Sequence, residues 1–134
     1  MQTLQHSMDG GKMTKNLNYK ARQISEKKNS IHDGIVNKLE KRIRQTTIGG
    51  EDYYSDIIKF EEYGPYNHRL GEVDLQAYNN DYFLFFEIKS HHTRKNRKKA
   101  KEQLSRAEEY YVREFNRKRT FKFYVAGKRI EWIK

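Results

Sequence analysis

The stretch GEVDLQAYNNDYFLFFEIK, residues 71–89, decides the fold of this chain. Two runs rich in apolar and aromatic residues flank Asn-Asn-Asp at residues 79–81, a pattern typical of a β-hairpin with a short turn. If residues 80 and 81 form the loop, residue 79 pairs with residue 82, and Asp74 lies directly opposite Glu87. Paired side chains on one face have Cβ atoms about 4.5–5.5 Å apart. The hairpin therefore predicts two neighbouring carboxylates.

The alternation of side chains supports this pairing. One predicted face is apolar and holds Val73, Leu75, Ala77, Leu84, Phe86 and Ile88. The other face holds Glu72, Asp74, Gln76, Glu87 and Lys89, together with Tyr78, Phe83 and Phe85. A register slip of one residue would mix the two sets.

The composition points to a polyanionic partner. The chain has 134 residues, with 28 Lys and Arg against 18 Asp and Glu, a formal net charge of +10. Such a balance favours nucleic acid or an anionic membrane surface. No apolar run approaches the ~20 residues needed to span a bilayer, and no secretory signal core is present near the N-terminus. Without cysteine there are no disulfides, thiolate metal sites or cysteine nucleophiles. We expect an intracellular, cytoplasmic protein associated with nucleoid or viral DNA and not with a membrane.

The chain before the hairpin predicts an arm and a helix. Residues 1–29 are polar and basic and predict a flexible arm, so that residues 30–134 form the single domain. Ser30 is the expected N-cap of a helix that reaches residue 45. Its expected apolar stripe consists of Ile31, Ile35, Leu39 and Ile43, widened by Val36. Gly49 and Gly50 end this segment.

The remaining elements follow from their periods. Strands are expected at residues 53–60, 70–78, 82–90, 121–126 and 129–133, with a loop at 61–69. A second helix is expected at residues 94–119, with an apolar stripe of Ala100, Leu104, Ala107, Tyr111 and Phe115. The predicted class is α/β.

Cations crowd the beginning of that second helix: Arg94, Lys95, Arg97, Lys98, Lys99 and Lys101. Such a run is usually a solvated surface, but here it follows Lys89 by five residues, which makes contact with DNA phosphates an equal alternative. Arg69 is a further expected DNA contact. His68, His91 and His92 are expected to contact phosphate or solvent and not a metal.

Two opposed carboxylates repel each other unless a cation neutralises them. An all-oxygen pair favours a hard divalent cation, Mg²⁺ with Mn²⁺ as an alternative, and the backbone carbonyl of Ile88 is a further candidate ligand. Lys89 would help to orient and deprotonate an attacking water or neutralise charge on a phosphate. The alternative is a surface hairpin that carries only a ladder of charges.

Asp74 and the triplet Glu87-Ile88-Lys89 resemble the motif of the PD-(D/E)xK, or restriction-endonuclease-like, nuclease superfamily. The string at residues 68–75 looks most like the branch of archaeal-type Holliday junction resolvases, and the resemblance covers about residues 31–111. It implies an α-β-β-β-α-β core with a mixed central sheet flanked by helices. Val73 stands where other members carry a proline before the first acid.

The resemblance implies two further site residues. Many members complete the metal site with an acid on the first helix, and Glu40 is best placed, with Asp33 and Glu26 as alternatives. From its position alone, Glu40 reads as a surface residue that pairs with Lys41 or Arg44. Several branches place a glutamine on the helix after the ExK strand, and Gln103 fits.

The resemblance thus implies a Mg²⁺-dependent endonuclease, structure-selective for branched DNA and working as a homodimer. Its catalytic residues would be Glu40, Asp74, Glu87, Lys89 and Gln103, of which Asp74, Glu87 and Glu40 hold the metal. Aromatic and apolar residues near the C-terminus, Phe121, Phe123, Tyr124, Trp132 and Ile133, are candidates for the dimer interface or for the core. The alternatives are a nuclease for flap, single-stranded or duplex DNA or for RNA, and a non-catalytic nucleic-acid-binding module.

Overall fold

The structure, a computed structural model, describes residues 29–65, 69–115 and 119–134. Five strands form one sheet in the order β3-β4-β5-β6-β7. Their bounds are β3 Asp56–Tyr63, β4 Gly71–Tyr78, β5 Tyr82–Lys89, β6 Arg119–Ala126 and β7 Arg129–Ile133. All neighbours are antiparallel except β5 and β6, which are parallel. The predicted α/β class with a mixed sheet is confirmed. Of the predicted arm at residues 1–29, only residue 29 belongs to the described residues.

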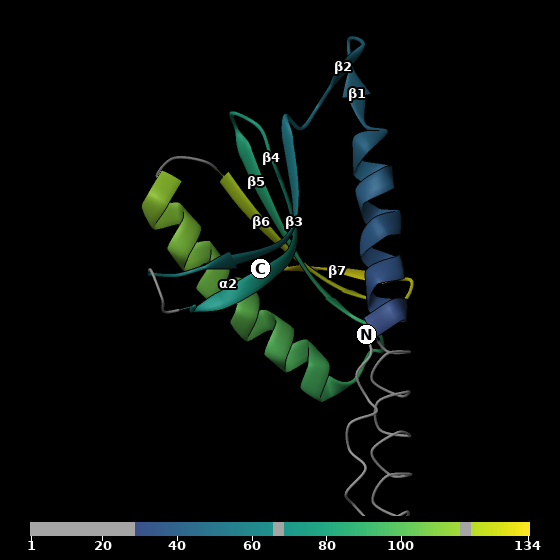
Figure 1. Ribbon diagram of the computed structural model, residues 1–134, viewed down its shortest axis with the longest axis vertical. Helices are drawn as coiled ribbons and strands as arrows, with labels where there is room; N and C mark the ends of the chain where they lie inside the picture. The colour runs from purple at the N-terminus through teal and green to yellow at the C-terminus, as the bar shows by residue number, and fades with distance from the viewer. Residues whose placement is uncertain (1–28, 66–68, 116–118) are drawn as a thin grey trace, which may run out of the picture.

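Helices cover the two faces of this sheet (Figure 1). The N-terminal helix, residues 29–44 of the described chain, packs against the face that contains Leu75, Ala77 and Ile88. The second helix, α2 Arg94–Phe115, packs against the other face. A small hairpin of β1 Thr47–Ile48 and β2 Glu51–Asp52 follows the N-terminal helix. Within the described residues, no helix has the length and apolar character needed to cross a membrane.

The N-terminal helix differs from its prediction in its start and in its buried face. Residue 29 is already helical, so Ser30 is not the N-cap. The buried side chains are Val36, Leu39 and Ile43, whereas Ile31 is 39% exposed. The predicted stripe is therefore rotated, because positions that recur every four residues drift around a helix of 3.6 residues per turn.

Several element bounds shift by a few residues. The first long strand is β3 and not residues 53–60, since Ser55 donates its backbone N–H to the carbonyl of Tyr78 and places Asp56 at the first paired position. Gly49 and Gly50, both with positive φ, form the turn between β1 and β2, a hairpin absent from the prediction. Helix α2 is described up to Phe115, and its predicted end at residue 119 is wrong because Arg119 already pairs with Tyr82 in β6.

The predicted register of the central hairpin is confirmed at four positions. Leu75 pairs with Phe86, and the pairs continue through residues 76 and 85 and residues 77 and 84 to Tyr78 and Phe83. The ladder ends there, one position before Asp74 and Glu87, so these two residues are not the cross-strand pair that was predicted. The pairing between β3 and β4 also skips Asp74 together with Phe60. Asp74 thus lies where the β3–β4 ladder is interrupted and just beyond the end of the β4–β5 ladder.

Side-chain alternation changes phase at this interruption. Leu75 packs with the N-terminal helix, but Val73, two residues away, packs in the α2 cluster with Phe83 and Phe85. The predicted placement of Val73 beside Leu75 is wrong, because regular alternation requires an unbroken strand. Figure 1 shows the end of β3 and the start of β4 bending across α2. This bend lets Asp74 leave the ladder while remaining buried.

Helix α2 confirms most of its predicted stripe. Ala100, Leu104, Ala107 and Tyr111 are buried, whereas Phe115 is 48% exposed at the last residue of the helix. Thr93 caps the helix by accepting the N–H of Asn96 on its hydroxyl at 2.9 Å. The helix thereby starts at the end of β5 that carries Glu87.

Two glycine substitutions test this packing. A Cβ at Gly71 would lie 2.6 Å from the hydroxyl oxygen of Tyr63 and 2.9 Å from its Cζ, and Tyr63 is only 5% exposed. Because this ring cannot move freely, we expect Gly71→Ala to lower the free energy of unfolding by about 1–3 kcal/mol. Gly34, in the N-terminal helix, meets nothing within 4 Å, so Gly34→Ala should raise it by about 0.5–1 kcal/mol. Urea unfolding of both variants measures the difference; equal stabilities would contradict this packing.

Candidate active site

Asp74 of β4 is held by contacts with β5 and with the N-terminal helix. Its side chain is buried, and Oδ2 accepts the backbone N–H of Ile88 at 2.9 Å. This contact stands where the ladder between β4 and β5 has ended, so the carboxylate takes over a bond that a backbone carbonyl would otherwise make. The same oxygen lies 3.2 Å from Nε2 of His32 on the N-terminal helix. The carboxylate is therefore fixed from two elements.

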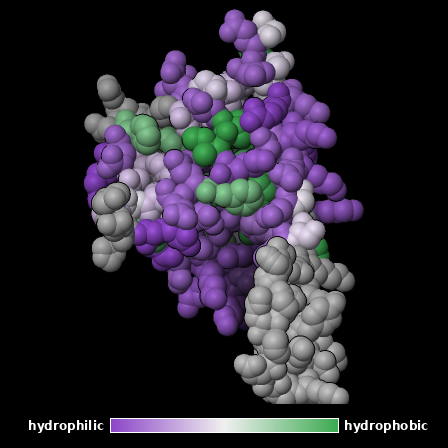
Figure 2. Space-filling view, viewed as in Figure 1, coloured by the Kyte–Doolittle hydropathy of each residue, from purple (hydrophilic) through white to green (hydrophobic). Residues whose placement is uncertain are grey.

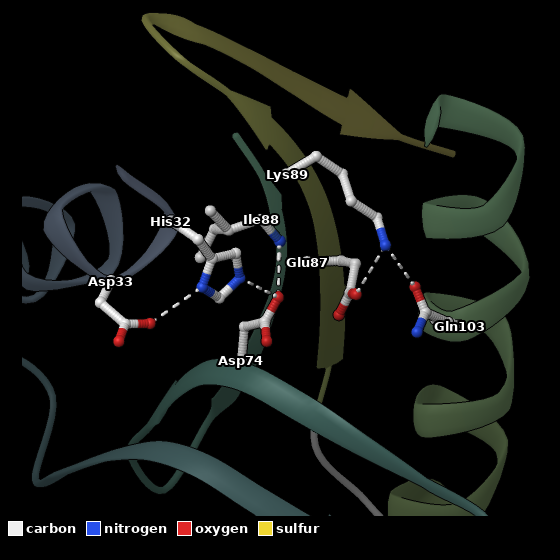
Figure 3. Close-up of polar contacts among 7 residues, drawn as sticks. All are labelled: His32, Asp33, Asp74, Glu87, Ile88, Lys89 and Gln103. Atoms are coloured by element: carbon white, nitrogen blue, oxygen red, sulfur yellow. Dashed lines mark hydrogen bonds and ion pairs between the residues drawn. The ribbon is translucent and has the colours of Figure 1, made fainter. Parts of the chain in front are cut away.

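Glu87 is the second buried carboxylate, 5% exposed on β5. The pKa of Glu87 is raised to about 8, first by burial and second by the nearby negative charge of Asp74, while Lys89 and His32 act in the opposite direction. The predicted repulsion between the two acids is thus present although they are not a ladder pair. Figure 3 shows the two carboxylates side by side.

Lys89 and Gln103 complete one side of the site. Lys89 Nζ lies 3.6 Å from Oε2 of Glu87 and donates to Oε1 of Gln103 at 3.3 Å. Gln103 comes from α2, which brings it beside Lys89 of β5, where the resemblance placed a glutamine of this helix. His32, Asp74, Glu87, Lys89 and Gln103 form a row from the N-terminal helix to α2 (Figure 3).

His32 is a site residue that the sequence analysis missed. The hydrogen bond to Asp74 is the main cause that raises the pKa of His32 to about 9, against desolvation, and Asp33 adds a smaller contribution through Nδ1. A protonated His32 neutralises Asp74 at neutral pH. Its spacing contains a usable signal: continuing the buried positions Ile43, Leu39 and Val36 backward in steps of four and three places His32 next.

Glu40 is not brought to the two carboxylates. Its carboxylate bonds Arg44 at 2.9 Å and Lys59 at 3.0 Å, and Lys59 foremost holds the pKa of Glu40 below its usual range. Of the alternatives, Asp33 contacts only the far nitrogen of His32, and Glu26 lies outside the described residues. On the N-terminal helix, the position next to Asp74 belongs to His32.

His32, Asp74, Glu87 and Lys89 lie around a pocket of about 390 Å³. Side chains from the N-terminal helix, β4, β5 and α2 form it: Asn29, His32, Glu72, Asp74, Glu87, Ile88, Lys89, Ser90 and Asn96. Asn96 stands in the first turn of α2, so the pocket opens beside the basic start of that helix. Asn29, Glu72 and Asn96 are lining residues that the prediction did not name as site residues.

The predicted phosphate contacts divide into two groups. Five of them are exposed on the first turns of α2: Arg94, Lys95, Lys98, Lys99 and Lys101. The first turn of this helix contains no acidic residue. Arg97 instead donates to Glu131 of β7, and Arg69 pairs with Glu62 at 2.7 Å. His92 contacts the hydroxyl of the buried Tyr124 at 2.9 Å, and His68 lies outside the described residues.

The donors for a metal ion are few. Within the residues that the structure describes, no group of three or more His, Asp or Glu side chains is arranged to hold a metal ion. Asp74 and Glu87 remain as two adjacent carboxylates, and the raised pKa of Glu87 indicates that Lys89 and His32 do not fully compensate the burial of its charge. This pair fits a hard cation that draws its remaining ligands from backbone oxygens, substrate and solvent, as Mg²⁺ does.

No protein-family model, curated protein or solved structure matches this chain. Family membership is therefore not established by similarity, and the resemblance over residues 31–111 stays a prediction. What the pocket can do follows from its own residues.

Proposed function

We propose that this protein is a metal-dependent endonuclease that hydrolyses phosphodiester bonds of DNA and belongs to the PD-(D/E)xK superfamily. The observation that carries the proposal is one pocket that contains two buried carboxylates and a lysine amine, Asp74, Glu87 and Lys89. The element order supports it too: a helix, three antiparallel strands, a second helix and a parallel strand follow one another around this pocket. The strands β1, β2 and β7 are additions to that order.

Asp74 and Glu87 would hold the cation, Mg²⁺ or Mn²⁺, with the carbonyl of Ile88 as a further ligand. Bound there, the cation supplies positive charge to a phosphate oxygen and makes an attacking water more acidic. Glu87 keeps a raised pKa although Lys89 and His32 lie nearby, and this unfavourable burial of a carboxylate next to Asp74 favours such a ligand. Glu40 has no part in this proposal, because Lys59 and Arg44 hold it elsewhere.

The other side chains act on the reacting groups. Lys89 stands beside Glu87 and can orient the attacking water or neutralise charge that develops on the phosphate. Gln103 accepts a hydrogen bond from Lys89 and so positions the amine. His32 holds Asp74 in place through its Oδ2 and shields its charge while no cation is bound.

The surface around the pocket suits a polyanion. Five exposed cations lie near the N-terminus of α2, where the partial charge of the helix is also positive. These like charges oppose helix formation unless phosphates neutralise them. A DNA backbone that crosses the start of α2 would relieve this repulsion and place a phosphate at the pocket.

Cleavage of a branched substrate by two matched cuts requires two sites, so the resolvase form of this proposal includes a homodimer. Among the predicted interface residues, Tyr124 and Ile133 are buried in the core. Trp132 is 53% exposed, and its ring lies 6.1 Å from the ring of Phe121 at a tilt of 52°. Trp132 and Ile130 thus offer apolar surface on β7 for a second copy.

One observation favours a second function, a non-catalytic nucleic-acid-binding module. The helix carboxylate that would complete the metal site is occupied by two cations, which leaves two carboxylates in the described site. Such a module would bind DNA in a salt-sensitive manner and cut nothing.

A substrate panel separates these functions. The purified protein is incubated with a four-way junction, a flap, a single strand and a duplex, each with and without Mg²⁺. We expect Mg²⁺-dependent cleavage, with symmetric cuts in the junction for a resolvase. Equal cleavage of every substrate would contradict the resolvase form of the proposal but would still support a nuclease. Salt-sensitive binding with no cleavage in Mg²⁺ or Mn²⁺ would reject the nuclease and support the binding module.

A further inference from the structure

Phe60 has an unusual backbone conformation beside the proposed site. Its φ is 56°, and it is the one non-glycine residue with positive φ among the residues that the structure describes. A bulky side chain rarely adopts this conformation, because Cβ then crowds the backbone. Phe60 also faces the position of Asp74, where the pairing of β3 with β4 is interrupted. Backbone strain of this kind is concentrated at functional sites.

The conformation changes the direction of the ring. Lys59 contacts Asn37 and Glu40 of the N-terminal helix, and in an extended strand the next residue would point to the opposite face. Phe60 nevertheless places its ring 6.2 Å from the ring of His32 on the same helix. Glu61, the following residue, contacts Gln76 and Tyr111 on the α2 side. The positive φ therefore turns one aromatic ring toward the site.

Packing accounts for only part of this ring. Phe60 is 39% exposed and belongs to neither buried cluster, unlike Tyr63 of the same strand. On the face seen in Figure 2 the surface is mainly hydrophilic, with apolar side chains exposed in small groups over the sheet. This partly exposed phenyl ring lies next to His32, and His32 contacts Asp74. The ring is therefore suited to stack against a planar group that binds beside the site.

We propose that Phe60 is a stacking platform for one unpaired base of the nucleic acid whose phosphate lies in the Asp74–Glu87 pocket. The inference rests on the proposed nucleic-acid substrate and makes it more specific. Aromatic side chains bind bases of any sequence through their faces, and a base can reach such a ring only when it has left the duplex stack. The preferred substrate therefore has a single-stranded or branch-point nucleotide beside the scissile phosphate.

The test asks whether the Phe60 ring and one particular base contribute to binding together. Binding of the full chain to a fluorescent single-stranded oligonucleotide is measured by anisotropy in EDTA, for a series of oligonucleotides that each carry one abasic position. We expect one abasic position to weaken wild-type binding about tenfold and to have no effect on Phe60→Gly. Glycine accepts positive φ, so this variant removes the ring while keeping the backbone, and a melting curve verifies its fold.

Two further variants complete the design. Phe60→Trp should retain the abasic effect, since it keeps a flat ring. Phe115→Leu, which replaces an exposed aromatic side chain at the last residue of α2, should also leave the effect unchanged. The same abasic penalty in wild type and in Phe60→Gly would overturn the proposal. Because binding is measured without a divalent cation, this outcome is separate from failure of the nuclease, which would appear as missing cleavage in the substrate panel.

Discussion

Asp74→Asn is expected to reduce metal-dependent DNA cleavage by at least ~10³-fold, because it removes a charged ligand worth several kcal/mol to the bound cation and the transition state. The substitution keeps the size of the side chain, and an amide oxygen can still accept the N–H of Ile88. Folding should therefore survive. Lys89→Ala is expected to reduce the rate by about 10²–10⁴-fold, through loss of the amine beside Glu87. Single-turnover cleavage at saturating Mg²⁺ measures both effects.

Matched variants lie at distant places in the same fold. Asp81→Asn changes the same chemistry at the exposed turn of the β4–β5 hairpin, and Lys128→Ala removes an exposed amine from the turn between β6 and β7. Both should cleave at nearly the wild-type rate. Unchanged cleavage by Asp74→Asn would show that the activity resides elsewhere or in a contaminant. Binding to DNA in EDTA should persist in all four variants, since the basic start of α2 is untouched.

Glu87→Gln is expected to stabilise the metal-free protein at pH 8 by roughly 2–4 kcal/mol. The pKa of Glu87 is about 8 in the folded chain against 4.5 for a free side chain, so its ionisation opposes folding. The neutral amide avoids this cost, although it also loses the attraction of Lys89 at 3.6 Å. Denaturant unfolding in EDTA measures the gain. A variant less stable than wild type at pH 8 would contradict a buried, poorly compensated carboxylate.

The pH dependence has a definite sign. Between pH 4.5 and 8 the folded state binds the Glu87 proton and the unfolded state does not, so wild-type stability falls as the pH rises. His32, with a pKa near 9 instead of 6.5, contributes stability that is complete below pH 6.5 and is lost toward pH 9. In Glu87→Gln only this second loss, from pH 6.5 to 9, should remain.

Added Mg²⁺ is expected to affect the stability of wild type and of Glu87→Gln differently. A cation that binds the folded state stabilises it in proportion to the logarithm of its concentration above the dissociation constant. Wild type should gain stability from Mg²⁺ at pH 8, because the cation offsets the unfavourable ionisation of Glu87 beside Asp74. Glu87→Gln should gain much less. Equal gains would mean that Mg²⁺ binds at another place.

Much of the fold was readable from local patterns. Two strands around a polar turn, and the helix with Ala100, Leu104, Ala107 and Tyr111 on one side, follow from periods of 2 and 3.6 that neighbouring residues impose on each other. The register near the turn was readable as well, since it depends on the turn, but the predicted direct pairing of Asp74 with Glu87 was wrong because the ladder ends at Leu75 and Phe86. The places of Lys89 and Gln103 followed from the same elements together with the resemblance.

Other features depend on contacts between distant segments. Glu40 does not reach the site because it forms an ion pair with Lys59 of β3. The rotation of the N-terminal helix places His32, and not Glu40, beside Asp74. The ion pair with Lys59 has no signature in the helix itself, and the spacing that leads to His32 can be used only once the buried face of the helix is known.

By itself, the sequence determined an α/β domain with two acids and a lysine gathered on one hairpin, because strand alternation and turn length are local properties. Only the tertiary structure decided that the ladder stops before Asp74 and that Phe60 turns toward His32. It also decided that His32, and not Glu40, meets the first acid. The physical reason is that a bend in β3 and β4 and the packing of a helix onto them minimise the energy of the whole core, a sum that no single stretch of sequence contains.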